Sequence, residues 1–260
     1  MRAVDLEELL QLADEGARRA GRLLIERFGG PARGVDTKSS PTDLVSDADR
    51  DSEQLLLDLI ASKRPDDGVL GEEGGGRPGT SGVTWIIDPL DGTVNYLYGI
   101  PVWCVSVAVR EQGRTLLGVI HDPNRNETFS AIRGGGAWVD GRRIGVSSQS
   151  ELSQALVATG FSYEADIRGA QAEVAARLLS KVRDVRRSGS AALDFCSLAC
   201  GRVDVFYESW LAPWDRAAGE LIALEAGATI SDLPPPRGNS IGVVAANPAL
   251  HPAVDELVRD

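Results

Sequence analysis

Two aspartates that stand three residues apart after an apolar run are the residues best suited to chemistry. Residues 83–87 (Val-Thr-Trp-Ile-Ile) predict a short β-rich run, and its end leads into Asp-Pro-Leu-Asp-Gly-Thr at 88–93. Pro89 restricts Asp88 to an extended conformation. A tight turn after Pro89 would let both carboxylates and the Leu90 carbonyl converge on one point. Such oxygen atoms are the ligands that hard cations like Mg²⁺ prefer.

The two residues after this pair predict an anion site beside the metal. A helix that begins at Gly92 and Thr93 presents free backbone N–H groups, which bind phosphate and similar anions. Metal ligands beside a phosphate cradle are what the hydrolysis of a phosphate ester requires. The alternative is that segment 88–93 is only a turn followed by a helix cap.

Further acids come from distant parts of the chain. Glu72 and Glu73 follow a strand-like segment and precede a glycine-rich stretch, and Asp215 precedes a predicted helix. Taken alone, Glu72 and Glu73 are compatible with plain surface charge and Asp215 with an ordinary N-cap. Together with the pair at 88 and 91, they favour one shared site.

The elements that must position these residues follow two different patterns. The first half, 1–147, predicts an α+β unit with helices over 4–28 and 47–63, antiparallel strands over 102–110, 115–120 and 127–132, and a hairpin turn at Asp140-Gly141. The second half, 148–260, alternates short apolar runs with helical patterns at 169–181, 190–200, 214–226 and 248–259, which favours an α/β unit. We expect the halves to form one compact unit.

Composition excludes several classes of protein. The 260 residues carry a formal net charge of −11 and no basic stripe, so we expect no nucleic-acid partner. Neither a signal peptide nor an apolar run of about 18 residues is visible, so we expect a soluble cytoplasmic protein without a membrane partner. The three cysteines outline no disulfide or zinc framework.

The acidic segments also match a family. The sequence resembles the inositol monophosphatase family of Mg²⁺-dependent, lithium-sensitive phosphatases. The resemblance rests on four segments in the same order and spacing: Asp-Leu-Val-Ser-Asp-Ala-Asp at 43–49, Gly-Glu-Glu at 71–73, Trp-Ile-Ile-Asp-Pro-Leu-Asp-Gly-Thr-Val-Asn at 85–95, and Trp-Asp-Arg-Ala-Ala-Gly at 214–219. It implies the layered αβαβα sandwich of the inositol monophosphatase and sugar phosphatase type, and a homodimer.

The resemblance implies a set of oxygen ligands for two to three Mg²⁺ ions per subunit. The ligands of the first ion would be Glu72, Asp88 and the Leu90 carbonyl, and those of the second Asp88, Asp91 and Asp215. A weaker third ion would be held by Asp47 and Glu72. The implied catalytic residues are Glu72, Thr93 and Asp47, with the first two orienting and activating the attacking water.

The resemblance also implies residues that bind substrate. The Gly92 and Thr93 amides would form the phosphate cradle, and Lys38 would lie on a mobile flap. The hydroxyl groups of the substrate would contact Gly189, Ser190, Ala191, Glu208, Asp91 and Asp215. The alternatives are a solvated loop lysine at 38, a surface acid at 208 and a helix start capped by Ser190.

The implied reaction is the hydrolysis of a phosphate monoester by direct attack of metal-activated water. The expected substrate is inositol 1-phosphate, because Val94-Asn95-Tyr96 resembles the inositol monophosphatase pattern. Histidinol phosphate and fructose 1,6-bisphosphate remain alternative substrates. A macromolecule-binding regulatory scaffold is a second alternative. A calcium-binding structural module is disfavoured, because the acids come from distant segments instead of one local loop.

Overall fold

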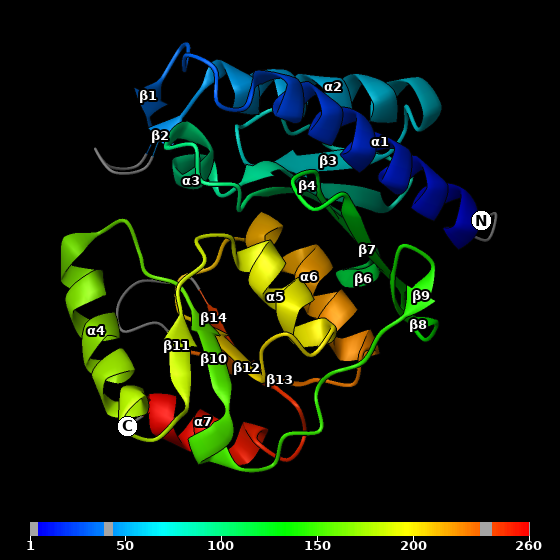
Figure 1. The fold of residues 1–260 in the computed structure, drawn as a ribbon. Coiled ribbons are helices and arrows are strands. Elements are labelled where there is room, and N and C mark those ends of the chain that lie inside the picture. Colours follow the sequence, from blue (N-terminus) through cyan, green and yellow to red (C-terminus); the bar gives the residue numbers. More distant parts are fainter. Residues whose placement is uncertain (1–4, 39–43, 235–240, 260) are drawn as a thin grey trace.

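The computed structural model describes residues 5–38, 44–234 and 241–259, and they form five layers (Figure 1). From one side to the other, the layers are a pair of helices, a seven-stranded sheet, a second pair of helices, a five-stranded sheet and a last pair of helices. This arrangement confirms the αβαβα sandwich. Asp43, part of the first family segment, lies outside the described residues.

The first outer layer consists of α1 (Leu6–Arg27) and α2 (Asp47–Lys63). The side chain of Asp5 accepts hydrogen bonds from two backbone N–H groups of the first turn of α1, which is how an N-cap aspartate starts a helix. Both helices bury apolar faces on one side of the seven-stranded sheet. The short strands β1 (Asp36–Thr37) and β2 (Leu44–Val45) lie beside them.

The seven-stranded sheet has the order β3-β4-β5-β6-β7-β8-β9. Its strands are β3 (Gly68–Gly71), β4 (Val83–Asp91), β5 (Cys104–Glu111), β6 (Arg114–Asp122), β7 (Glu127–Ile132), β8 (Gly136–Val139) and β9 (Arg142–Arg143). Only β3 and β4 pair in parallel, and the other neighbours are antiparallel, as the sequence predicts for the strands that correspond to β5, β6 and β7. A short helix, α3 (Thr93–Leu97), follows β4 directly.

The five-stranded sheet has the order β11-β10-β12-β14-β13, with β10 parallel to both of its neighbours. Its strands are β10 (Leu156–Thr159), β11 (Asp184–Arg186), β12 (Val205–Glu208), β13 (Thr229–Leu233) and β14 (Gly242–Ala246). A 3-10 turn (Leu152–Gln154) precedes β10. The outer face of the sheet is covered by α4 (Ala165–Leu179) and α7 (His251–Arg259).

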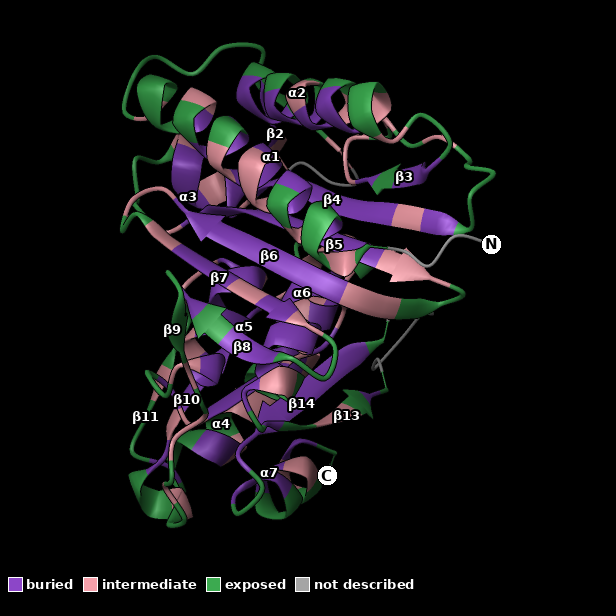
Figure 2. Ribbon diagram, turned by 90° about the vertical axis from the view of Figure 1, so that its right-hand side faces the viewer, coloured by how far each residue is buried: buried purple, intermediate pink, exposed green. Residues whose placement is uncertain are grey.

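The middle layer joins the two sheets. Helices α5 (Ala191–Ala199) and α6 (Pro213–Glu225) pack Leu193 and Leu221 against the seven-stranded sheet, and Phe195 and Ala223 against the five-stranded sheet. Figure 2 shows the buried residues concentrated between the layers. The helices therefore belong to the second half of the chain but complete the core of the first. Within the described residues, no helix is long and apolar enough to cross a membrane.

Candidate functional site

One pocket of about 280 Å³ collects nearly all the residues that the sequence singles out. It is lined by segments that follow β3, β4, β10 and β12 and by the starts of α5 and α6. The predicted residues that line it are Lys38, Glu72, Asp88, Leu90, Asp91, Gly92, Thr93, Gly189, Ser190, Ala191, Glu208 and Asp215. Of the predicted site residues, Asp47 does not line this pocket.

The end of β4 brings Asp88 and Asp91 together through a bulge instead of the expected tight turn. Asp88 pairs with Ser106 and Asp91 with Cys104, and the register shifts between the two pairs. A proline inside a strand is typical of such a bulge, because it cannot donate to the ladder. The strand therefore continues to Asp91.

Gly92 makes the chain change direction after the bulge. Its φ is +98°, and a Cβ there would lie 2.9 Å from the Val102 carbonyl oxygen. Glycine is therefore required at this position both for the positive φ and because a side chain would clash with the Val102 carbonyl group. Thr93 then begins α3, as predicted, although the helix has only five residues.

The acids of the pocket carry more negative charge than their surroundings offset. Burial raises the pKa of Asp88 well above its usual range, and the nearby charges of Glu72, Asp91 and Asp215 raise it further. Burial also raises the pKa of Asp91 to about 6, although hydrogen bonds from Ser190 and the α5 backbone oppose the shift. The pKa of Asp215 is raised in the same way, first by burial and then by Glu72 and Asp91.

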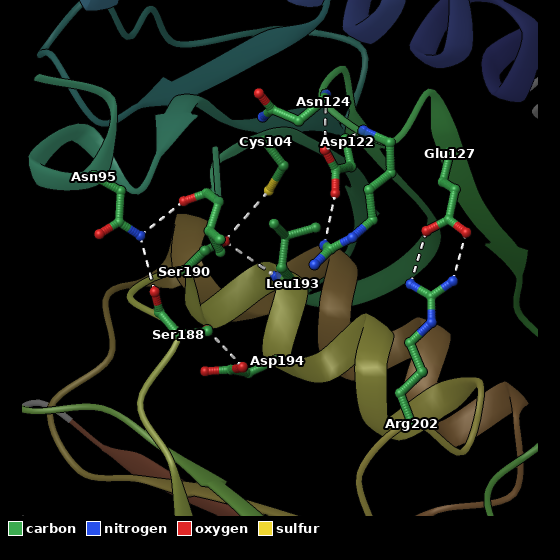
Figure 3. A network of polar contacts seen from close by, with 12 residues as sticks. Asn95, Cys104, Asp122, Asn124, Glu127, Ser188, Ser190, Leu193, Asp194 and Arg202 are labelled. Atoms are coloured by element: carbon green, nitrogen blue, oxygen red, sulfur yellow. Dashed lines mark hydrogen bonds and ion pairs between the residues drawn. The ribbon is translucent and has the colours of Figure 1, made fainter. Parts of the chain in front are cut away.

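The start of α5 holds one oxygen of Asp91. The Ser190 hydroxyl donates to Asp91 Oδ2 at 2.6 Å, and the Ala192 N–H donates to the same atom at 2.8 Å. Ser190 Oγ also accepts from Leu193 N at 3.3 Å as the N-cap of α5, and Cys104 Sγ lies 3.7 Å from it (Figure 3). The Ser190 hydroxyl, expected at the substrate, thus donates its single proton to a predicted metal ligand.

The hydroxyl of Thr93 has a partner that sequence reasoning missed. Thr93 Oγ1 lies 2.8 Å from Asp49 Oδ1 and 3.0 Å from the Leu90 carbonyl oxygen. Asp49 is fully buried, and its other oxygen accepts from the N–H and hydroxyl of Ser46 in a capping box. A serine followed three residues later by an acid is the sequence pattern of a capping box, and this spacing of Ser46 and Asp49 could have indicated that Asp49 points inward.

Asp47 lies away from the pocket. Its side chain is 53% exposed and pairs with Arg50 at 3.2 Å. It occupies the first position of α2, whereas Asp49 at the third position points inward. The structure thus places Asp49, and not Asp47, beside Thr93.

Lys38 reaches the site from the segment after β1. Its Nζ lies 2.8 Å from Glu72 Oε1 and 2.5 Å from Glu73 Oε1. Burial lowers the pKa of Lys38, but the charges and hydrogen bonds of Glu72 and Glu73 together outweigh burial and the net shift is upward. Glu53, which the sequence analysis did not single out, accepts from the N–H groups of Glu73 and Gly75 and so orients this loop.

The far end of the pocket holds two more carboxyl groups. Burial, followed by the charge of Asp194, raises the pKa of Glu208 well above its usual range. Burial raises the pKa of Asp194 to about 7, and Ser188 Oγ donates to its carboxylate at 2.7 Å (Figure 3). Asp194 and Arg187 also line the pocket, and the sequence analysis named neither.

Asp215 lies at the third position of α6 and not at its N-cap. Its Oδ2 accepts from the Ala212 N–H at 2.6 Å, which closes the first turn of the helix. Asn95 links the two halves nearby, because its side-chain amide donates to the Val102 and Ser188 carbonyl oxygens. The pocket therefore forms where the halves meet.

The donor set fits a hard divalent cation. Asp88 is 1% exposed, and its neighbours Glu72, Asp91 and Asp215 only add negative charge. A buried cluster of this kind needs cations to offset the repulsion. Across residues 5–38, 44–234 and 241–259, no group of three His, Cys, Asp or Glu side chains is already arranged to hold an ion.

Comparison with known proteins supports what this geometry suggests. The chain belongs to the inositol monophosphatase family, whose model matches residues 5–260. It is 45% identical over 252 residues to inositol-1-monophosphatase SuhB of Mycobacterium tuberculosis, which covers 93% of this chain and 86% of that protein. It is 38% identical over 259 residues to Nus factor SuhB of Escherichia coli, covering 98% of this chain and 97% of that protein.

Solved structures share the fold. The extragenic suppressor protein suhB of Bartonella henselae superposes with a TM-score of 0.90 at 33% identity, covering 97% of this chain and 99% of that one. IMPase of Thermotoga maritima superposes with a TM-score of 0.87 at 35% identity and 96% coverage of both chains. The protein is thus a member of the inositol monophosphatase family, whose relatives here include both inositol-1-monophosphatases and proteins named Nus factor SuhB.

Proposed function

We propose that this protein is a Mg²⁺-dependent phosphomonoester hydrolase that releases phosphate from inositol 1-phosphate. The observation that carries the proposal is the gathering of Glu72, Asp88, Asp91 and Asp215 in one pocket with Thr93. These acids come from three separate segments of the chain. Burial raises the pKa of Asp88, the charges of Glu72, Asp91 and Asp215 raise it further, and a bound cation would offset this concentration of negative charge.

Each residue has a distinct part in the proposed reaction. Bound Mg²⁺ would supply acidified water and offset charge on the attacking and leaving oxygens. Glu72, Asp88, the Leu90 carbonyl, Asp91 and Asp215 would hold it. Two to three ions per subunit are expected.

The hydroxyl of Thr93 would orient the attacking water. Asp49 takes the place that the sequence analysis gave to Asp47, because its carboxylate accepts from that hydroxyl at 2.8 Å and so fixes its direction. Glu72 would accept the proton of the water. Lys38 Nζ donates to Glu72 Oε1 at 2.8 Å, so this contact would compete with a cation for the same carboxylate.

The remaining groups would bind the ester. Gly92 and Thr93 line the pocket at the start of α3, and their amides would bind the phosphate oxygens. Glu208 and the Gly189–Ala191 segment line the far end, where the leaving alcohol would lie. A carboxyl group with a raised pKa, such as Glu208, can donate a hydrogen bond to a hydroxyl as well as accept one.

The test is phosphate release from a panel of esters: inositol 1-phosphate, fructose 1,6-bisphosphate and histidinol phosphate. Each is assayed with Mg²⁺, with EDTA and with added Li⁺. Mg²⁺-dependent release that is fastest from inositol 1-phosphate supports the proposal. Preference for another ester keeps the mechanism and changes the substrate. No release from any ester, with Mg²⁺ demonstrably bound, refutes the catalytic assignment.

A second candidate function is a macromolecule-binding regulatory scaffold. It is favoured by the 38% identity to a protein named Nus factor SuhB. An Asp91→Asn variant separates the two functions, because it removes a metal ligand and leaves the outer surface intact. Loss of phosphate release with full complementation of a deletion strain would favour the scaffold. A homodimer is also proposed, and light scattering of the purified protein tests it.

A further inference from the structure

Trp210 has a backbone conformation that a bulky residue rarely adopts. Its φ is +80°, in the left-handed region that favours glycine, and it lines the pocket just after β12. A non-glycine residue in this region is strained, and such strain persists only where the surrounding structure enforces it. Strained residues of this kind concentrate at binding and catalytic sites.

The neighbouring segments enforce this conformation. Gln171, buried on α4, donates to the carbonyl and hydroxyl oxygens of Ser209 at 3.1 and 2.8 Å. Its side-chain oxygen accepts from the Ser162 N–H at 2.8 Å. One buried amide thus ties the segment after β10 to the segment after β12. On the other side of Trp210, Leu211 is buried in the core.

The two tied segments both contribute aromatic rings to the pocket. Phe161 and Tyr163 line it from the segment after β10, and Trp210 lines it from the segment after β12. Gly160 lets the segment after β10 pass close to Glu208, since a Cβ there would lie 2.1 Å from the Glu208 carboxyl group. We call Phe161, Tyr163 and Trp210 the aromatic wall. Glu208 and Asp194 line the same pocket.

We propose that Trp210 is a specificity-determining residue, and that the aromatic wall binds the face of a ring-shaped leaving group such as a cyclic polyol or sugar. This inference rests on the proposed phosphatase function. A cyclic polyol presents apolar C–H bonds on its faces and hydroxyl groups at its edge. The faces suit flat aromatic surfaces, and the hydroxyls suit the carboxyl groups of Glu208 and Asp194. An open-chain polyol has no such face.

The variant Trp210→Gly tests this without damaging the fold, because glycine relieves the positive φ. We expect its melting temperature to equal or exceed that of the wild type. The KM for inositol 1-phosphate should rise about tenfold, the usual effect of losing one good apolar contact. The KM for glycerol 2-phosphate, an open-chain ester, and the inhibition constant of inorganic phosphate should both change less than about twofold.

Two more variants separate the aromatic face from bulk. Trp210→Leu keeps the strained backbone and an apolar side chain, so it should be as stable as the wild type but share the higher KM for inositol 1-phosphate. Trp210→Phe should restore most of the loss. In binding experiments without turnover, inositol plus phosphate should change the tryptophan fluorescence of the wild type and of Trp138→Phe. The change should be smaller in Trp210→Phe, where Trp214 is the tryptophan that still lines the pocket. Trp138 is partly exposed on β8, outside the pocket.

Three results would overturn the inference. Trp210→Gly and Trp210→Leu with unchanged KM for inositol 1-phosphate would mean that the ring is not a contact. Equal effects on the cyclic and open-chain esters would mean a general structural role. In both cases an active wild type leaves the proposed function standing. A wild type that hydrolyses no phosphate ester overturns both together.

Discussion

Removing the hydroxyl of Ser190 should weaken Mg²⁺ binding, because this hydroxyl supports a proposed metal ligand. In the structure this hydroxyl donates to Asp91 Oδ2 at 2.6 Å, and the Ala192 N–H is the other strong donor to that oxygen. A hydrogen bond to a charged group contributes about 1.5–3 kcal/mol. Because the backbone donor remains in Ser190→Ala, we take the lower end of this range, which corresponds to about one pKa unit.

The sign of the effect follows from the pKa of Asp91. Burial already raises this pKa to about 6, and the Ser190 hydroxyl opposes the shift. Its loss moves the pKa up by about one unit, so that a proton competes with the cation at pH 7. At pH 7 the ionised fraction of Asp91 falls from about nine-tenths to about one-half, so the Mg²⁺ dissociation constant should rise about twofold at pH 7 and return toward the wild-type value at pH 8.5.

Titration calorimetry with Mg²⁺ at the two pH values measures this directly. Ser190 also caps α5 through Leu193 N, so Ser190→Ala should cost about 1 kcal/mol of folding free energy, or about 2–4 °C in melting temperature. Ser190→Thr should restore both quantities. Ser188→Ala is the matched control, because the Ser188 hydroxyl donates to Asp194 instead of Asp91. If Ser190→Ala left the Mg²⁺ affinity unchanged and raised the KM, the proposed support of Asp91 by Ser190 would be refuted. The Ser190 hydroxyl would then be assigned to substrate binding.

Four other variants test the carboxyl groups in and around the site. Burial raises the pKa of Asp194 to about 7. The contribution of this carboxyl group to folding stability is therefore present below about pH 4 and is lost as the pH rises through 7. Asp194→Asn should raise the melting temperature more at pH 8 than at pH 5. Asp88→Asn should raise the melting temperature in EDTA, because it removes a buried charge, and should abolish the further rise that Mg²⁺ gives the wild type. Asp49→Ala should lower the rate of phosphate release about a hundredfold at saturating Mg²⁺, because the Thr93 hydroxyl loses the partner that orients it. Asp47→Ala should change this rate less than about threefold, because Asp47 is exposed and paired with Arg50. A larger effect of Asp47→Ala than of Asp49→Ala would return the catalytic role to Asp47.

Local signals account for most of what the sequence predicted correctly. The helix over 47–63 has the same bounds in the structure, because a serine cap precedes it and Pro65 follows it. Alternation of apolar residues identified β5, β6 and β7. The pair at Asp88 and Asp91 and the acids at 72 and 215 also lie in one pocket, as expected.

Features set by the geometry of the folded chain were not predictable in the same way. Asp47 and Asp49 are both acids in the first turn of α2, and a family motif alone does not say which faces inward. Side chains that are two positions apart in an α-helix point about 200° apart around its axis, so only one of Asp47 and Asp49 can reach Thr93. The choice depends on how α2 packs against β4. Trp210 is a similar case, because no pattern of residue types indicates its positive φ.

The link between Ser190 and Asp91 explains why the site could not be assembled from either half alone. The two residues are 99 positions apart, and Asn95 makes a parallel link to Ser188 over 93 positions. Both links form only when α5 docks on the seven-stranded sheet, and that docking is driven by apolar contacts such as those of Leu193. We therefore propose that 1–147 and 148–260 act as one unit. The same apolar layer that joins the sheets sets the position of Asp91, so changes in the core beneath α5 should alter cation binding before they alter the fold.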